Sequence, residues 1–179
     1  AFEPSPRSFA LLKRNVYQNK LTRVKLINAA VASKSGKMNF YTSKSENDPW
    51  GRGDSLKENK FNNKLKSKVV RATTVKLSNY IKSPIDLLKL DIEGAETEVI
   101  EEIEPKLKYI KQIILEFHSN IYNPENKFST IMKILHRNSF KTKFFISQWP
   151  ISKIGVNIVL AILPQLKIDE FWLRIYAQR

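Results

Sequence analysis

The sequence contains no cysteine, which excludes disulfide bonds, thiolate nucleophiles and cysteine metal sites. Only two of its 179 residues are histidine, and one of them follows an apolar run that is typical of a buried strand. A single histidine at a strand end is a poor basis for a metal site. From the sequence alone we therefore expect no metal.

Long apolar runs are also lacking. The longest, such as residues 154–163, are far shorter than the roughly 20 residues that cross a bilayer. The first residues do not show the basic and then apolar pattern of a secretory signal. We expect a soluble, cytoplasmic protein whose 42% hydrophobic residues form the core of one domain over residues 1–179.

Acidic residues are few compared with basic ones. Seventeen Asp and Glu stand against 31 Lys and Arg, so the formal net charge is +14. Such a charge attracts polyanions, and nucleic acid is therefore an open partner. The basic residues are mostly scattered lysines, without an arginine-rich block or a base-stacking aromatic motif. A generally solvated basic surface is favoured over a dedicated nucleic-acid face.

The hydrophobic pattern predicts an alternation of strands and helices. A first helix is expected to begin after Ser5, with Pro6 at its first position. Further helices are expected at 77–81, 95–103, 128–135 and 169–178, and strands at 24–32, 38–41, 69–75, 85–92, 110–117, 141–147 and 156–162.

This alternation predicts an α/β fold of the Rossmann-like kind, with a doubly wound, mostly parallel sheet. The run 85–92 is apolar enough for a strand that is covered on both faces. Turn residues at 33–36 favour a hairpin-like extension into 38–41. The strands 141–147 and 156–162, on either side of a turn at Trp149-Pro150, are expected to pair as an antiparallel edge.

Two segments stand outside this alternation. Residues 44–68 have almost no apolar side chains, which is typical of a flexible insertion or flap. Residues 169–178 are aromatic, and a helix there would place Phe171, Trp172, Ile175 and Tyr176 on one side. This stripe favours a core or subunit contact, with contact to a membrane surface as the alternative.

Ligands of doubly wound sheets bind beyond the carboxyl ends of the strands. Glu3 takes such a position, where a carboxylate can accept two hydrogen bonds from a ribose diol. A solvated turn carboxylate before a helix is the alternative. The same rule selects other strand ends: Asn28, Ala29 and Ala30, then Asp91, then Glu116 to His118.

An acidic cluster follows the strand 85–92. Asp91, Glu93 and Glu96 could receive a positively charged ligand, or could complement the dipole of the following helix. The dipole suffices for Glu96 but explains less well an Asp inside an apolar run. His118 is a candidate general base or a structural histidine, whereas His136 is expected on the surface of a helix.

Three motifs occur in order along residues 1–118. They are AFEPSP at 1–6, LKLDIEGAE at 88–96 and ILEFH at 114–118, with NAAV at 28–31 and VKL at 75–77 between them. This series resembles the FkbM-type methyltransferases. The resemblance implies a class I methyltransferase fold, S-adenosylmethionine as the methyl donor, and a hydroxyl of a sugar, glycan or small metabolite as the acceptor.

The resemblance also implies roles for the selected residues. Glu3 would hold the ribose of the donor, and Asn28, Ala29 and Ala30 would border the adenine. Asp91 would lie near the methionine end and the reacting hydroxyl, as a catalytic residue together with Glu93, Glu116 and His118. The acceptor side would be lined by Glu93, Glu116 and His118. A sulfonium donor is already activated, so the protein mainly has to align an in-line attack and help to remove the hydroxyl proton.

The family begins with a strand and a glycine-rich cofactor loop. The five glycines of this chain stand at 36, 51, 53, 94 and 155, and none belongs to such a loop. We therefore expect an N-terminally truncated domain. Two alternatives stay open: an RNA methyltransferase, suggested by the net charge, and a non-catalytic binding or assembly module.

Overall fold

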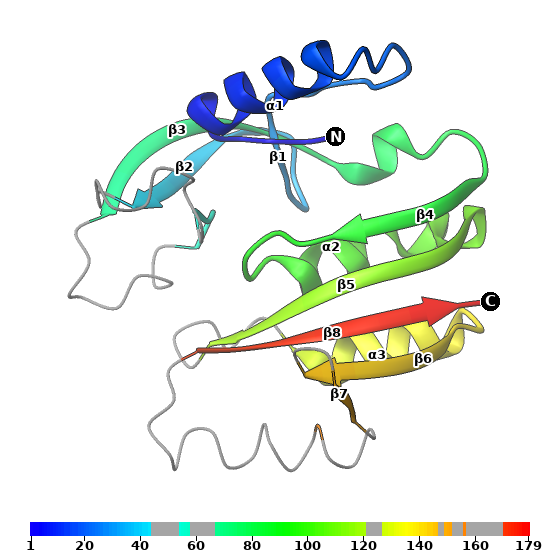
Figure 1. Ribbon diagram of the computed structural model, residues 1–179. Helices are drawn as coiled ribbons and strands as arrows, with labels where there is room; N and C mark the ends of the chain where they lie inside the picture. The colour runs from blue at the N-terminus through cyan, green and yellow to red at the C-terminus, as the bar shows by residue number, and fades with distance from the viewer. Residues whose placement is uncertain (44–53, 58–66, 121–126, 147–148, 152–155, 157–169) are drawn as a thin grey trace.

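The computed structural model describes the chain except for residues 44–53, 58–66, 121–126, 147–148, 152–155 and 157–169 (Figure 1). Its helices and strands, in chain order, are α1 (Pro6–Gln18), β1 (Ala30–Val31), β2 (Gly36–Ser43), β3 (Ser67–Val75), the 3-10 helix η2 (Leu77–Tyr80), β4 (Ile85–Leu90), α2 (Glu96–Ile103), the 3-10 helix η3 (Glu104–Tyr109), β5 (Ile110–Asn120), α3 (Phe128–Arg137), β6 (Lys141–Ile146), β7 (Trp149–Ile151) and β8 (Glu170–Gln178).

A five-stranded sheet has the strand order β4-β5-β8-β6-β7. Strand β4 is parallel to β5, and β8 is antiparallel to both β5 and β6. Strands β4, β5 and β6 therefore run in one direction, and the helices α2 and α3 connect them in turn. Both helices lie behind this sheet in Figure 1. The predicted β-α-β alternation is confirmed for this part of the chain.

The main core lies between this sheet and its two helices. Val99 and Ile103, which are spaced four residues apart on α2, are fully buried against Leu115 of β5 and Leu135 of α3 in one hydrophobic cluster. Burial of each such side chain contributes about 1.5–3 kcal/mol. The core therefore fixes the ends of β4 and β5 relative to the start of α2.

A second, three-stranded sheet has the order β1-β3-β2. The prediction of a hairpin at 33–36 is wrong, because the strands on either side of this turn do not pair with each other. Strand β2 pairs along its length with β3, and β1 lies on the other side of β3. The predicted strand 24–32 is also too long. Only Ala30–Val31 form a strand, with a parallel bridge between Ile27 and Phe2, while Val24 is 40% exposed.

The edges of the five-stranded sheet also differ from the prediction. Among the described strands β4 is terminal, and Leu87 is 50% exposed, so this strand is not covered on both faces. The short strand β7 does form an antiparallel edge, at the place where a turn was predicted. Another reversed strand, β8, lies inside the sheet. The predicted strand 156–162 falls outside the described residues except for Val156.

The predicted helix at 169–178 is wrong, since these residues contain strand β8. Leu173, Ile175 and Ala177 are buried, and they alternate with the less buried Arg174 and Tyr176. This period of two is typical of a strand. The membrane-surface alternative depended on a helix and loses its basis. No helix in the described ranges is long and apolar enough to span a membrane.

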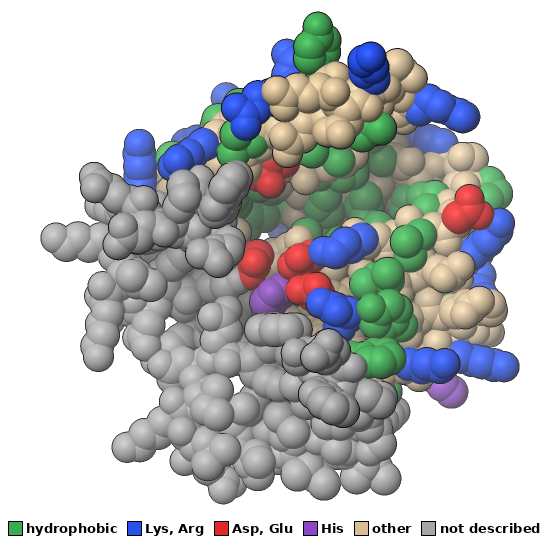
Figure 2. Space-filling model, in the orientation of Figure 1, with side chains coloured by type: hydrophobic (Ala, Val, Ile, Leu, Met, Phe, Trp, Pro, Cys, Tyr) green, Lys and Arg blue, Asp and Glu red, His purple; other side chains and the backbone are tan. Residues whose placement is uncertain are grey.

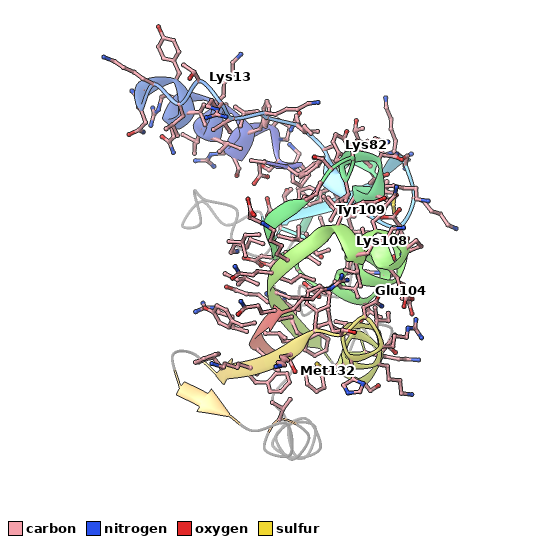
Figure 3. All side chains as sticks on the ribbon, turned by 90° about the vertical axis from the view of Figure 1, so that its right-hand side faces the viewer. Lys13, Lys82, Glu104, Lys108, Tyr109 and Met132 are labelled. Atoms are coloured by element: carbon pink, nitrogen blue, oxygen red, sulfur yellow. The ribbon has the colours of Figure 1, made fainter. Side chains whose placement is uncertain are left out.

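The charged side chains are distributed unevenly over one face of the molecule. Figure 2 shows Lys and Arg spread over this face, whereas most of the Asp and Glu side chains and one His lie near its centre. The side view in Figure 3 shows cationic side chains such as Lys13, Lys82 and Lys108 on several separate elements. In these two views positive charge is spread out, whereas most of the negative charge on the face in Figure 2 lies near its centre.

Candidate functional site

A pocket lies where three separate segments end: the bridge at Phe2, strand β1 and strand β4. Of the residues predicted to bind the cofactor, Glu3, Ala29, Ala30 and Asp91 all line this pocket, although they are far apart in the sequence. Glu93 lines it as well. The carboxyl ends of the strands thus meet at one place, as the rule for α/β sheets predicts.

The pocket is strongly acidic. Glu3, Asp54, Asp91 and Glu93 line it, and no Lys or Arg is among its described lining residues. Burial raises the pKa of Glu3, a hydrogen bond from the Ser5 backbone partly offsets this rise, and the nearby charge of Asp54 adds to it. In a chain of net charge +14, this local field favours a positively charged ligand.

The turn before α1 holds Glu3 in place. Its Oε1 accepts a hydrogen bond of 2.8 Å from the backbone N–H of Ser5. Ser5 is the N-cap residue and Pro6 follows at the first position, as predicted, although the Ser5 side chain makes no capping hydrogen bond. Asn28 is exposed and does not line the pocket. Its Nδ2 donates to the carbonyl oxygens of Glu3 and Pro4, at 2.8 and 3.3 Å, so Asn28 fixes the segment that carries Glu3.

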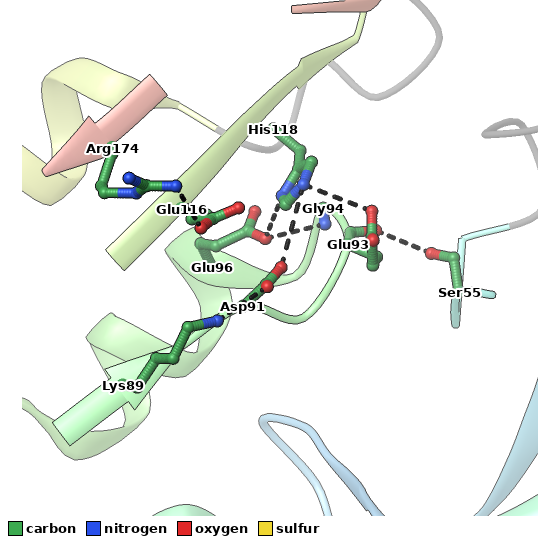
Figure 4. Close-up of polar contacts among 9 residues, drawn as sticks. All are labelled: Ser55, Lys89, Asp91, Glu93, Gly94, Glu96, Glu116, His118 and Arg174. Carbon is green, nitrogen blue, oxygen red and sulfur yellow. Dashed lines mark hydrogen bonds and ion pairs between the residues drawn. The ribbon is translucent and has the colours of Figure 1, made fainter. Parts of the chain in front are cut away.

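The loop between β4 and α2 brings two acids to His118. Glu93 and Gly94 have φ angles of 58° and 102°, and this left-handed pair turns the chain sharply after Asp91. His118 Nε2 then lies 3.3 Å from Glu93 Oε2 and 3.9 Å from Asp91 Oδ1 (Figure 4). The structure thus brings together three of the four predicted catalytic residues.

Glu96 is a site residue for which the sequence analysis found the helix dipole a sufficient explanation. Its side chain is fully buried, and its Oε1 lies 2.9 Å from His118 Nδ1 and accepts a hydrogen bond of 3.0 Å from the Gly94 N–H. It therefore orients the imidazole and holds the sharp turn. The place of Glu96 in the acidic cluster indicated a possible role in the site. The spacing of residues along the chain does not show that its side chain is buried.

The fourth predicted catalytic residue, Glu116, has a different partner. Its Oε1 accepts a hydrogen bond of 3.2 Å from Arg174 of β8, and it does not line the pocket (Figure 4). Lys89 donates to Asp91 Oδ2 at 2.8 Å, on the other side of the acidic cluster. The second histidine, His136, is exposed on α3, as predicted.

Residues 54–57 lie within the segment 44–68 that was predicted to be a flexible insertion. Ser55 is 1% exposed, and its backbone exchanges hydrogen bonds of 2.8 and 3.0 Å with Tyr41. Its hydroxyl donates to the Glu93 carbonyl oxygen at 2.7 Å. Asp54 and Ser55 are thus site residues that the sequence analysis missed. The rest of the segment, up to the start of β3, lies outside the described residues.

Comparison with known proteins identifies a family for this chain. A family model described as the methyltransferase FkbM domain matches residues 1–142, which include the pocket and the cluster around His118. No curated protein and no solved structure matches the chain.

Proposed function

Because the chain belongs to the FkbM methyltransferase family, we propose that it transfers a methyl group from S-adenosylmethionine to a hydroxyl group of a sugar, glycan or small metabolite. The observation that carries this proposal is the acidic pocket, which adjoins the cluster of Asp91, Glu93 and His118. The three codirectional strands joined by α2 and α3 support the finer assignment to a Rossmann-like class I fold.

The donor would occupy the pocket between Glu3 and Asp91. The Glu3 carboxylate suits a ribose diol, since its two oxygens can accept two hydrogen bonds. Ala29 and Ala30 are buried and small, and they leave room for a flat adenine ring. The acids at the other end, Asp91 and Glu93, suit the positive charges of the methionine part.

The acceptor hydroxyl would lie on the side of His118. In the reaction a bond forms between the hydroxyl oxygen and the methyl carbon, the carbon–sulfur bond breaks, and its electron pair stays on sulfur. The hydroxyl proton has to leave, and the cluster of Asp91, Glu93 and His118 is where it would be lost. Glu116, held by Arg174, would border the acceptor further along β5.

An RNA acceptor is the second candidate, favoured only by the net charge of +14. Binding through phosphates would weaken steeply as salt is added, because each contact releases counterions. The scattered cations in Figure 2 and the acidic pocket favour a less charged acceptor.

Glu3→Ala is expected to weaken the binding of S-adenosylmethionine by about 1.5–3 kcal/mol, the range for losing hydrogen bonds to a charged group. Isothermal titration calorimetry of the full chain measures this change. Glu104→Ala removes a carboxylate that pairs with Arg137 outside the pocket, and it should leave the affinity unchanged. Equal affinities of Glu3→Ala and the unmodified chain would exclude Glu3 from the donor site.

Donor binding should also depend on pH through Glu3. Only the ionised carboxylate accepts both ribose hydrogen bonds, and burial raises the pKa of Glu3 above its ordinary value. Affinity is therefore gained as the pH rises through this raised pKa, and it is lost as the pH falls through it. In the same calorimetric titrations, Glu3→Gln should bind more weakly at pH 7 and lose this pH dependence. An unchanged pH dependence would assign it to another group.

A further inference from the structure

Three potential metal ligands converge at the end of β4 and β5. Asp91, Glu93 and His118 each offer one ligand atom, and these atoms all lie within 4.8 Å of one another. The residues come from two strand ends that the buried core holds in register, with Leu90 opposite Leu115. A set of one imidazole and two carboxylates is therefore held together before any ligand binds.

The orientation of His118 defines which ring nitrogen faces the acids. The Glu96 carboxylate accepts hydrogen bonds, so the Nδ1–H of His118 donates to it at 2.9 Å. When Nε2 carries no proton, its lone pair faces Glu93 Oε2 and Asp91 Oδ1, so the three groups can ligate one cation.

We propose that Asp91, Glu93 and His118 bind a divalent metal ion, with Glu96 as the residue that orients the histidine ligand. Metal-bound histidines almost always donate their other ring N–H to a carboxylate or carbonyl, as His118 does here. Carboxylates suit Mg²⁺ and Mn²⁺, whereas imidazole suits later transition metals, so Mn²⁺ matches this mixed set best. No metal was expected from the sequence, because the two acids join the histidine only in the folded chain.

The consequence for substrate choice rests on the proposed function. Three protein ligands leave coordination positions open, and an acceptor with neighbouring hydroxyls, such as a sugar diol, could fill two of them. A metal-bound hydroxyl loses its proton to water more easily than a free one, because the metal stabilises the oxyanion. That oxygen would then attack the methyl carbon while the carbon–sulfur electron pair stays on sulfur.

The test is a titration of the full chain with Mn²⁺, without donor or acceptor, in which electron paramagnetic resonance measures the free ion. We expect saturable binding at a single site. Asp91→Asn and Glu93→Gln should each weaken it about tenfold or more, and Glu96→Gln should weaken it less, because the amide oxygen can still accept from His118. Glu104→Gln is the matched control, since Glu104 and Glu93 are each 26% exposed, and it should bind as the unmodified chain does.

Circular dichroism of each variant separates lost binding from lost folding. The proposal is overturned if the folded chain shows no saturable Mn²⁺ binding, or if Asp91→Asn and Glu93→Gln bind as tightly as Glu104→Gln. Calorimetry with S-adenosylmethionine is independent of this result. If the chain binds Mn²⁺ but does not bind S-adenosylmethionine, the metal site stands and the proposed function is wrong. If the chain binds S-adenosylmethionine but does not bind Mn²⁺, the proposed function stands and the metal site is wrong.

Discussion

Asp91→Asn is expected to slow methyl transfer about 100-fold, within the range by which positioned proton-transfer groups accelerate reactions. The substitution removes the negative charge that faces His118 Nε2 and keeps an oxygen that can accept from Lys89. The fold and most donor contacts are retained, so the donor affinity should change much less than the rate. Transfer rates and calorimetric affinities, measured on the same preparation, separate the two effects.

A purely structural role for Asp91 predicts a different result. If it capped α2, the variant would lose about 1 kcal/mol of stability and keep its rate per folded molecule. The N-cap residue of α2 is Ala95, which argues against that role. Asp86→Asn is the matched control, because Asp86 lies on β4, the strand that ends just before Asp91, and also pairs with a lysine, Lys111. It should leave the rate unchanged, and a parent-like rate for Asp91→Asn would make Asp91 structural.

Leu173→Ala is expected to lower the free energy of unfolding by about 2–5 kcal/mol, as buried leucine truncations do. Leu173 is fully buried in β8, between β5 and β6. Tyr176→Ala is the control on the same strand. Tyr176 is 37% exposed and packs edge-on against Phe145, so its loss should cost about 0.5–1.5 kcal/mol.

Denaturant unfolding followed by circular dichroism measures both changes. A helix at the C-terminus would place Tyr176 on the packed stripe and Leu173 off it. A larger loss for Tyr176→Ala than for Leu173→Ala would therefore contradict the position of β8 in the sheet.

The β-α-β part of the fold could be predicted because its signals are local. Strand β4, helix α2 and strand β5 each follow from a short apolar run or a spacing of four, and Pro105 marks the end of α2. The rule for strand ends then selected Glu3 and Asp91, which line one pocket, and His118, which lies beside Asp91. These inferences need no knowledge of which distant segments pair.

The failures concern contacts between distant segments. Residues 169–178 fit a helical stripe as well as an alternation of Leu173, Ile175 and Ala177, and only hydrogen bonds to β5 and β6 decide for the strand. The pairing of β2 with β3 across residues 44–66 leaves no signal in the turn at 33–36. Likewise, Ser55 and the buried Glu96 gain their roles from partners that the sequence places far away.

Methyl transfer to a hydroxyl is measured with a labelled methyl group. The full chain is incubated with S-adenosylmethionine that carries the label, together with Mn²⁺ and sugars, glycans, small hydroxylated metabolites or RNA. The assignment predicts label in an ether on a sugar or small-molecule hydroxyl, and about 100-fold less of it with Asp91→Asn. Label in RNA alone, or in none of these acceptors while the chain is folded, would contradict it.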